Sequence, residues 1–257
     1  MSDRTREIAK IIDNDRLAHG YYLMRLASPV IAARAKPGQF VHIKLPENNA
    51  IYLRRPISIC RADAAAGTIE LFYKTVGNGT EMLSELTSEQ TLDMMGPIGT
   101  AFPLETGKRP LLIAGGMGIA PLIMLVERIN RDLCSPTVYY GAHTANELFF
   151  ITDIGRYAEL HCVCDDEAGD VVSALPKVAS NFSSVFACGP IPMLRAVQKW
   201  AAAHNVRGFV SLEERLACGI GACSGCAFPM RVGLRRTYKK VCVDGPVFPL
   251  EEVIFDE

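Results

Sequence analysis

Four of the chain's nine cysteines lie in one short stretch, "RLACGIGACSGCAFPMRVGLRRTYKKVCVDG", residues 215–245. Their spacing is C-x4-C-x2-C-x15-C, and they are Cys218, Cys223, Cys226 and Cys242. Thiolates are ligands for zinc and for iron–sulfur clusters, and the glycines between them free the loop to wrap such a group. The segment therefore indicates a metal-containing centre.

The spacing distinguishes between the possible centres. C-x4-C-x2-C with a distant fourth cysteine is the plant-type [2Fe–2S] pattern. Zinc knuckles more often show paired C-x2-C units, and buried free thiols rarely gather four in so short a segment. We therefore expect a [2Fe–2S] cluster whose sulfurs accept hydrogen bonds from N–H groups of the glycine-rich loop. The cysteines outside this spacing are expected to be small core residues: Cys60, Cys134, Cys162 and Cys164.

Composition excludes several classes of protein. The 257 residues include 27 basic and 28 acidic side chains, so no net field favours nucleic acid or an anionic membrane. The longest uncharged run, residues 110–126, is interrupted by glycines and Pro121, so no transmembrane helix is expected. The charged start "MSDRTREIAKIIDNDR" lacks the apolar region of a signal peptide. We expect a soluble, cytoplasmic protein with reduced cysteines.

The first part of the chain, up to about Pro103, has the pattern of short strands separated by Gly and Pro turns. In "FVHIKL", Val41 and Ile43 point to one face while Phe40 and His42 point to the other. "TIELFYKTV", residues 68–76, alternates in the same way. Many short strands of this kind predict a small antiparallel β-barrel.

Strands and helices alternate from Arg109 to about Phe209. "PLLIAGG", "TVYYGA" and "SVFACG" are typical of buried strands, and "PLIMLVERINRDL" and "PMLRAVQKWAAAH" of helices. The alternation predicts a Rossmann-like, parallel α/β domain. The rest, from Ser211, looks irregular. The expected multi-domain fold, β plus α/β, thus comprises a barrel (1–104), an α/β domain (105–210) and a cysteine segment (211–257), with polar "ETGKRP" as the first linker.

Two loops of the α/β part have the chemistry of a phosphate site. In "IAGGMGIAP", glycines follow a buried strand and precede a helix, so the backbone can approach a pyrophosphate. Pro121 stands where the G-x-G-x-x-G fingerprint has its third glycine, and a purely structural turn is the alternative. "CGP" ends another strand, at the edge where such sheets bind ligands. The loops contain Gly115, Gly116, Gly118, Cys188, Gly189 and Pro190.

The nucleotide expected in this domain is NAD. "YYGAHTANELFF", residues 139–150, contains no arginine or lysine to receive a 2′-phosphate. His143 is the one residue there that could partly substitute. NADH is therefore expected to be preferred over NADPH.

Two motifs of the barrel part could bind a second phosphate-containing cofactor. "RRPISIC" presents Arg55 and then the hydroxyl of Ser58 on a strand. "GNGT" places Gly79 and Thr80 at a helix start, where Thr80 is expected as the N-cap. An arginine beside such a loop could hold a diphosphate, and the serine could touch a flavin ring. Taken singly, a solvated strand edge and an ordinary helix cap are the alternatives.

A barrel with "RPIS" and "GNGT", followed by "GGMGIAP" and "CGP", resembles the ferredoxin–NADP reductase superfamily of flavoproteins. The resemblance implies that Arg55 holds the FAD diphosphate, that Ser58 bonds near flavin N5, and that Cys188 lies near the nicotinamide. The implied FAD contacts are Arg55, Pro56, Ile57, Ser58, Phe72, Tyr73, Lys74, Gly79 and Thr80. The implied nicotinamide-nucleotide contacts are Gly115, Gly116, Gly118, Pro121, Cys188, Gly189 and Pro190.

The cysteine segment narrows the resemblance. "EERLACGIGACSGCAFP" followed by "YKKVCVDGPVFPLEEV" resembles the electron-transfer subunits of NAD-dependent type B dihydroorotate dehydrogenases, and the likeness covers essentially the whole chain. It implies two copies each of this chain and of an FMN-containing catalytic subunit that oxidises dihydroorotate in pyrimidine synthesis. The implied electron route runs from the partner's FMN through the [2Fe–2S] cluster and FAD to NAD. No site for dihydroorotate itself is found in the sequence.

Two other functions are compatible with the motifs. One is the reductase subunit of another NAD(P)H-linked complex, of the hydrogenase, sulfide dehydrogenase or transhydrogenase type. The other is a non-catalytic redox sensor. "AFPMRVGLRRTYKK", residues 227–240, mixes aromatic residues, Met and Arg as protein interfaces do, so it is the expected docking surface. A solvated hairpin that offsets the cluster's charge is the alternative.

Overall fold

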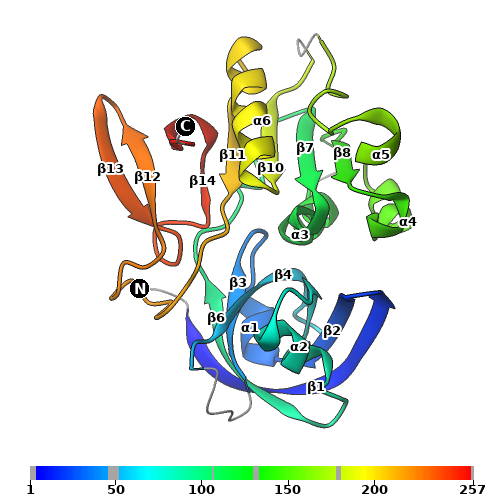
Figure 1. Ribbon diagram of the computed structural model, residues 1–257, viewed down its shortest axis with the longest axis vertical. Helices are drawn as coiled ribbons and strands as arrows, with labels where there is room; N and C mark the ends of the chain where they lie inside the picture. The colour runs from blue at the N-terminus through cyan, green and yellow to red at the C-terminus, as the bar shows by residue number, and fades with distance from the viewer. Residues whose placement is uncertain (1–3, 46–51, 106, 130–132, 178–180, 256–257) are drawn as a thin grey trace.

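A computed structural model of the chain describes residues 4–45, 52–105, 107–129, 133–177 and 181–255. Figure 1 shows a barrel built from the N-terminal part, an α/β sheet above it, and a two-stranded hairpin projecting at one side. None of the helices in these residues is long and apolar enough to cross a membrane.

The barrel is closed and antiparallel, as the alternating sequence predicts, with the strand order β1-β2-β5-β4-β3-β6. Its strands are β1 (Thr5–Ala18), β2 (Tyr21–Ala27), β3 (Phe40–Lys44), β4 (Arg55–Asp63), β5 (Thr68–Lys74) and β6 (Thr91–Ile98). Two short helices, α1 (Pro29–Arg34) and α2 (Asn78–Ser84), complete it. Alternate side chains such as Val41, Ile43 and Leu71 fill its core.

The outward face of β3 is also buried, which the sequence does not predict. Phe40 and His42 alternate with the inward-facing Val41 and Ile43, yet all four side chains are at most 6% exposed. Phe40 belongs to a core shared with the α/β sheet and the cysteine segment. The alternation of side chains along β3 therefore separates a face inside the barrel from an outward face that the rest of the protein covers.

The α/β sheet has the order β14-β11-β10-β7-β8-β9. Its strands are β7 (Pro110–Gly115), β8 (Thr137–Ala142), β9 (Glu159–Cys164), β10 (Ser184–Cys188), β11 (Gly208–Ser211) and β14 (Val247–Pro249). All neighbours pair in parallel except β14, which lies antiparallel to β11. The α/β domain is therefore parallel, as predicted, and the cysteine segment adds one antiparallel strand at its edge.

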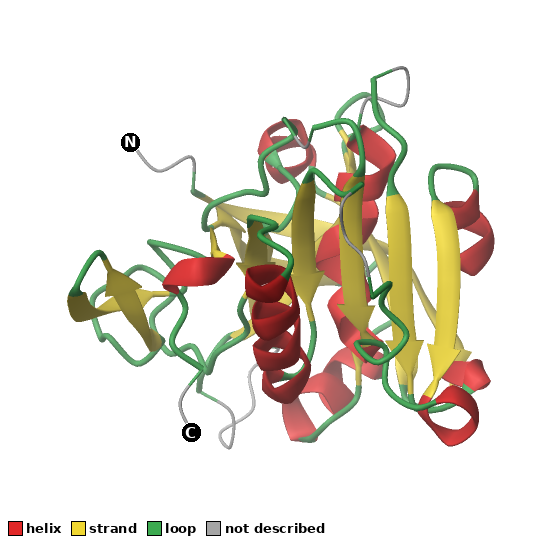
Figure 2. Cartoon of the chain, turned by 90° about the horizontal axis from the view of Figure 1, so that it is seen from above, coloured by secondary structure: helices red, strands yellow, loops and turns green. Residues whose placement is uncertain are grey.

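Helices cover both faces of this sheet (Figure 2). Along β7, Leu111 and Ile113 pack on the side of α6 (Ile191–Ala203), while Leu112 and Ala114 pack on the side of α3 (Ala120–Arg128). Helix α3 ends at Arg128, earlier than "PLIMLVERINRDL" predicts, and residues 130–132 of that motif lie outside the described residues. The remaining short elements are η1 (Gly116–Ile119), η2 (Ala145–Glu147), α4 (Ile151–Gly155) and α5 (Asp165–Ala168).

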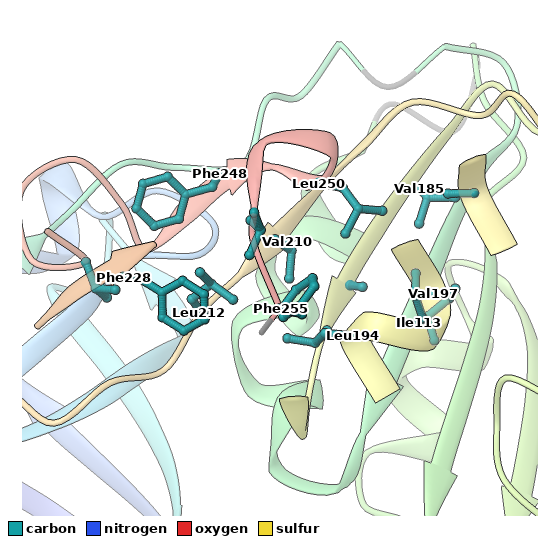
Figure 3. Close-up of a cluster of buried hydrophobic side chains, with 14 of the residues drawn as sticks. Ile113, Val185, Leu194, Val197, Val210, Leu212, Phe228, Phe248, Leu250 and Phe255 are labelled. Atoms are coloured by element: carbon teal, nitrogen blue, oxygen red, sulfur yellow. The ribbon is translucent and has the colours of Figure 1, made fainter. Parts of the chain in front are cut away.

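The cysteine segment is more regular than expected. It forms the antiparallel hairpin β12 (Ala227–Val232) and β13 (Arg235–Lys240), strand β14 and the 3-10 turn η3 (Leu250–Glu252). Its apolar side chains join those of the sheet and α6 in one cluster (Figure 3). Phe228, Phe248 and Phe255 belong to the same cluster as Ile113 and Val210 of the sheet. The segment is thus anchored to the α/β domain by burial of its apolar side chains.

Arg61 of β4 joins the barrel to the α/β domain. Its guanidinium lies 2.7 Å from Glu127 of α3, 2.8 Å from Asp153 of α4 and 3.3 Å from Glu70 of β5. The same group lies 5.3 Å from the centroid of the Phe150 ring. One partly buried cation therefore neutralises carboxylates from both domains.

We predict that Arg61→Leu lowers the free energy of unfolding by about 2 kcal/mol, because it leaves a partly buried set of carboxylates without their cation. Urea denaturation followed by circular dichroism would measure the loss. Arg25→Leu is the matched control, since Arg25 pairs with Asp13 at an exposed site and should cost at most about 1 kcal/mol. Equal losses in the two variants would contradict the assigned role of Arg61.

Candidate functional site

The four clustered cysteines come together as two pairs. The Sγ atoms of Cys226 and Cys242 lie 3.3 Å apart in the buried base of the segment. Cys218 and Cys223 occupy the outer part of the loop, where the N–H of Cys223 lies 3.4 Å from Cys218 Sγ. Among the described residues, no group of three or more His, Cys, Asp or Glu side chains converges on a single metal position.

Backbone N–H groups point at the outer thiols. The N–H of Ile220 lies 3.5 Å from Cys218 Sγ, and the N–H of Gly225 lies 3.4 Å from Cys223 Sγ. Hydrogen bonds from the backbone of Cys223 and Ile220 lower the pKa of the Cys218 thiol to about 6. Burial instead raises the pKa of Cys242 to about 12. The loop therefore favours one thiolate by itself, while the buried thiol requires a cationic centre to lose its proton.

The other cysteines only partly follow the prediction that they are core residues. Cys60 and Cys164 are buried, but Cys134 is half-buried and Cys162 is exposed. The prediction is wrong for Cys162, because β9 is the edge strand of the sheet and only its last two residues, Val163 and Cys164, are buried.

The "RPIS" and "GNGT" motifs meet at one end of the barrel. Arg55 begins β4, and its guanidinium lies so close to Gly79 of α2 that a Cβ there would collide with Arg55 Nε. The N-cap of α2 is Gly77, not Thr80, so the capping prediction is wrong. The Thr80 hydroxyl lies inside the first turn, accepts from the N–H of Val76 at 2.8 Å and bonds the Gly77 carbonyl at 3.0 Å. Thr80 therefore fixes the loop that faces Arg55.

The rings of Phe72 and Tyr73 are covered by protein. Phe72 is 2% exposed and packs against Tyr21 and Phe150. Tyr73 is 3% exposed, and its hydroxyl donates to Asn14 Oδ1 at 2.9 Å. Lys74 donates to the Tyr21 hydroxyl at 2.7 Å. The two ring side chains are thus committed to packing.

The two glycine loops of the α/β domain interlock. Gly118 is in such close contact with the Cys188 carbonyl that a Cβ there would collide with it. A Cβ on Gly189 would lie 3.0 Å from the backbone nitrogen of Gly115. Since β7 and β10 are neighbours, their carboxyl ends place both motifs at the same edge of the sheet. The structure therefore brings the two sequence motifs together.

Cys188 presents its backbone rather than its thiol at this edge. The side chain is 0% exposed and is hydrogen-bonded to Ser211 of the neighbouring strand. Burial raises the pKa of the thiol, so it is protonated at neutral pH. A further group near this edge is Asp165, whose carboxylate lies 3.9 Å from His143 Nδ1. From the sequence this acid is not assigned to the nucleotide site, because it follows β9 rather than the next strand after the glycine loop.

His42 is the other residue that sequence reasoning missed. Its side chain is 0% exposed, and burial lowers its pKa to about 4. Its Nδ1 faces Gly219 of the cysteine loop, where a Cβ would lie only 2.5 Å away. On the neighbouring strand β4, Pro56 of the "RPIS" motif pairs with His42. The only signal in the sequence was the alternation of "FVHIKL", which gives the face but not what covers it.

Comparison with known families supports both cofactor-bearing regions. Residues 9–102 match the oxidoreductase FAD-binding domain, and residues 213–254 match the iron–sulfur cluster binding domain of dihydroorotate dehydrogenase B. The solved structure titled as an NADH-dependent reduced ferredoxin–NADP oxidoreductase covers 97% of this chain and 90% of its own, with a TM-score of 0.85 at 28% identity. A ferredoxin–NADP+ reductase from Neisseria gonorrhoeae, at 17% identity, covers 79% and 92% with a TM-score of 0.65 and shares the fold.

Two relatives are more similar to this chain in sequence than these solved structures are. The protein of Geobacillus sp. (strain WCH70) named dihydroorotate dehydrogenase B (NAD(+)), electron transfer subunit, is 36% identical over 97% of this chain and 98% of its own. The protein of the same name from Bacillus caldolyticus is 35% identical over the same shares. With this identity over nearly the whole length, the chain belongs to the family of dihydroorotate dehydrogenase B (NAD(+)) electron transfer subunits.

Proposed function

We propose that this chain passes electrons from the FMN of a dihydroorotate-oxidising partner subunit, through a [2Fe–2S] cluster and FAD, to NAD+ in pyrimidine biosynthesis. The observation that carries the proposal is the paired cysteine loop packed against β3, the strand next to the "RPIS" strand β4, in a chain of this family. Neither a reductase subunit of another NAD(P)H-linked complex nor a redox sensor is favoured by the relatives' names. We place the activity in the cytoplasm, whose reducing conditions suit a chain with nine cysteines.

The proposed division of labour follows the three parts of the chain. Residues 1–104 bind FAD, residues 105–210 bind NAD, and residues 211–257 bind the cluster. When bound, FAD exchanges a hydride with nicotinamide and single electrons with the cluster. The chain's own residues would bind the cofactors in the sequence cluster, FAD and NAD, with each next to the following one.

The cysteine loop fits a two-iron cluster. Two close pairs of thiols suit two irons bridged by sulfide better than one tetrahedral zinc ion, which needs four convergent donors. The N–H groups of Ile220 and Gly225 lie where they would bond to the thiolates and offset their charge. We assign Cys218, Cys223, Cys226 and Cys242 as the ligands.

At the proposed FAD site, Arg55 is the phosphate anchor. Its guanidinium lies over Gly79, where the missing side chain leaves room for the diphosphate and the cation beside it. Ser58 lies on the same outward face of the barrel as Pro56 and pairs with Phe40, two residues along β3 from His42. Its hydroxyl is the proposed partner of flavin N5. Because Phe72 and Tyr73 are packed, only the backbone of that strand and Lys74 are proposed to run along the cofactor.

The interlocked loops form the proposed NAD site. The backbone of Gly115, Gly116 and Gly118 lines the pyrophosphate path ahead of Pro121, and Cys188–Pro190 faces the nicotinamide through its backbone. Asp165 beside His143 supports NAD over NADP, because a carboxylate repels a 2′-phosphate and accepts ribose hydroxyls.

The hairpin β12–β13 is the proposed docking surface for the partner. Leu234 at its tip is fully exposed, and Tyr238 is 62% exposed, while Arg235 and Arg236 are also exposed. Other members of the "AFPMRVGLRRTYKK" motif are committed within the chain. Phe228 and Met230 are buried, Lys239 pairs with Glu252, and Lys240 donates to the Gly221 carbonyl.

We predict that Cys223→Ser removes most of the iron and the [2Fe–2S] absorption while flavin content stays near that of the wild type, because the FAD site lies in the barrel. Iron, sulfide and flavin assays with visible spectra would measure this. Cys162→Ser, at an exposed thiol outside the loop, should leave all three unchanged. Zinc in place of iron in the wild type would overturn the cluster assignment.

We predict that Arg55→Ala weakens FAD binding roughly tenfold to a hundredfold, since a bidentate guanidinium–phosphate contact is lost. Flavin retained after dialysis is the readout, with Arg16→Ala, on an exposed part of β1, as the control. Ser58→Ala should instead slow flavin reduction by NADH and spare binding. Unchanged flavin retention in Arg55→Ala would contradict the assignment.

The decisive experiment is reconstitution with the FMN subunit. Alone, the chain should oxidise NADH with dyes and leave dihydroorotate unchanged; with the partner, dihydroorotate should reduce NAD+. Reversing charge in Arg235→Glu with Arg236→Glu should slow the coupled reaction roughly tenfold and spare dye reduction, because interface arginines often dominate binding. Arg16→Glu with Lys36→Glu, on exposed barrel positions, is the matched control. Dihydroorotate oxidation by the isolated chain would sink the proposal.

A further inference from the structure

His42 carries an unmet hydrogen-bonding requirement in the middle of the protein. Within the described residues, the buried side-chain nitrogens and oxygens without a partner are Nδ1 and Nε2 of His42 and Nε of Arg195. His42 is thus the only side chain in that set with two such atoms. A buried polar atom without a partner destabilises the folded state, so native proteins rarely leave one unless a bound group satisfies it.

The geometry shows where such a group would lie. On β3, His42 shares the outward face with Phe40, and Phe40 packs into the core that contains Cys226 and Cys242. Nδ1 faces Gly219, the residue after Cys218, and the φ of +67° at Gly219 together with the 2.5 Å clearance excludes any side chain there. Arg4 also reaches this loop, with Nη1 3.4 Å from the Gly219 carbonyl. The imidazole therefore lies directly beneath the cysteine loop.

The backbone of His42 is fixed by the barrel rather than by the loop. The His42 carbonyl accepts a hydrogen bond from Arg54 Nη1 at 3.2 Å, and Arg54 Nη2 lies 2.9 Å from Asp93 Oδ1. β3 is paired on both sides, with β4 and with β6. A neutral imidazole always has one N–H donor. The barrel thus holds the backbone of this donor in place beneath the cysteine loop.

We propose that His42 donates this N–H to a sulfur of the bound iron–sulfur cluster, either a bridging sulfide or the Cys218 thiolate, and thereby positions the cluster and raises its reduction potential. A donor to a cluster sulfur stabilises the reduced, more negative state. His42 acts as a positioning residue between the "RPIS" strand, through its pairing with Pro56, and the cluster. The inference rests on the proposed function, since it requires a [2Fe–2S] cluster at these cysteines.

The test uses the full chain with its cofactors and compares three variants. His42→Leu removes the donor. His42→Asn retains an amide N–H near the position of Nδ1. His19→Leu removes an exposed histidine of the barrel, which contacts Arg16, and serves as the control. Cluster potential is measured by EPR-monitored redox titration, and contact is measured by pulsed EPR of the reduced cluster in protein labelled with ¹⁵N-histidine.

We expect His42→Leu to shift the reduction equilibrium of the cluster about tenfold toward the oxidised form, which is 59 mV for one electron. His42→Asn should recover most of this shift, and His19→Leu should show none. The wild type should show a ¹⁵N coupling that His42→Leu abolishes. A wild-type cluster without that coupling, or an unchanged potential in His42→Leu, overturns the inference.

Two further outcomes are also decisive. If His42→Leu loses the cluster altogether, the ¹⁵N coupling in the wild type decides: its presence supports the hydrogen bond and its absence refutes it. Iron and sulfide analysis of the wild type distinguishes a failure of the proposed function from a failure of the role assigned to His42. A wild type without equal iron and sulfide refutes the proposed function, whereas a loaded wild type without histidine coupling refutes only the role of His42.

Discussion

The arrangement of this protein depends on one shared hydrophobic core. The cysteine segment, residues 211–257, is too short to be stable on a core of its own, since chains below about 70 residues usually need a metal, a disulfide or another domain for stability. Its Phe228, Met230 and Phe248 therefore pack with Ile113 and Val210 of the sheet. Phe40 and Ile98 of the barrel complete the same core. Burial of these side chains places the cysteine loop where the barrel and the sheet meet.

The same constraint explains why the sheet ends in an antiparallel strand. β14 follows Cys242 and pairs with β11, so the chain returns from the cysteine loop directly into the sheet. The loop is thereby held at both ends, through Ser211 before it and β14 after it. A redox centre exchanges electrons efficiently only with a close and fixed neighbour, and this double attachment supplies the rigidity. Arg61 does the equivalent for the two larger domains by binding carboxylates from both.

Polar groups complete what the core begins. Backbone N–H groups of the cysteine loop point at Cys218 and Cys223, and His42 approaches the loop from the barrel side. Arg55 over Gly79 and Gly118 against Cys188 show the same device at the other two sites, since each relies on a glycine for close approach. In all three places a glycine, which has no side chain, allows the neighbouring group to approach the backbone closely.

The sequence by itself determined the chemistry and the kinds of element. Cysteine spacing indicates a cluster because ligand geometry restricts the chain locally. The alternation of apolar and polar residues predicts the barrel, and the alternation of strands with helices predicts the α/β sheet, because burial follows these patterns. Local capping was less predictable: Thr80 lies within the first turn of α2, because its hydroxyl bonds the preceding loop instead.

Only the tertiary structure decided which surfaces are covered. The alternation in "FVHIKL" assigns His42 to the outer face, but the burial of that face by the cysteine loop depends on residues far away in the chain. Cys188 and Phe72 are likewise buried, the first beside a neighbouring strand and the second beside aromatic rings, and no local pattern specifies these neighbours. Long-range packing is a property of the folded chain as a whole, so a local pattern can identify a face without identifying its partner.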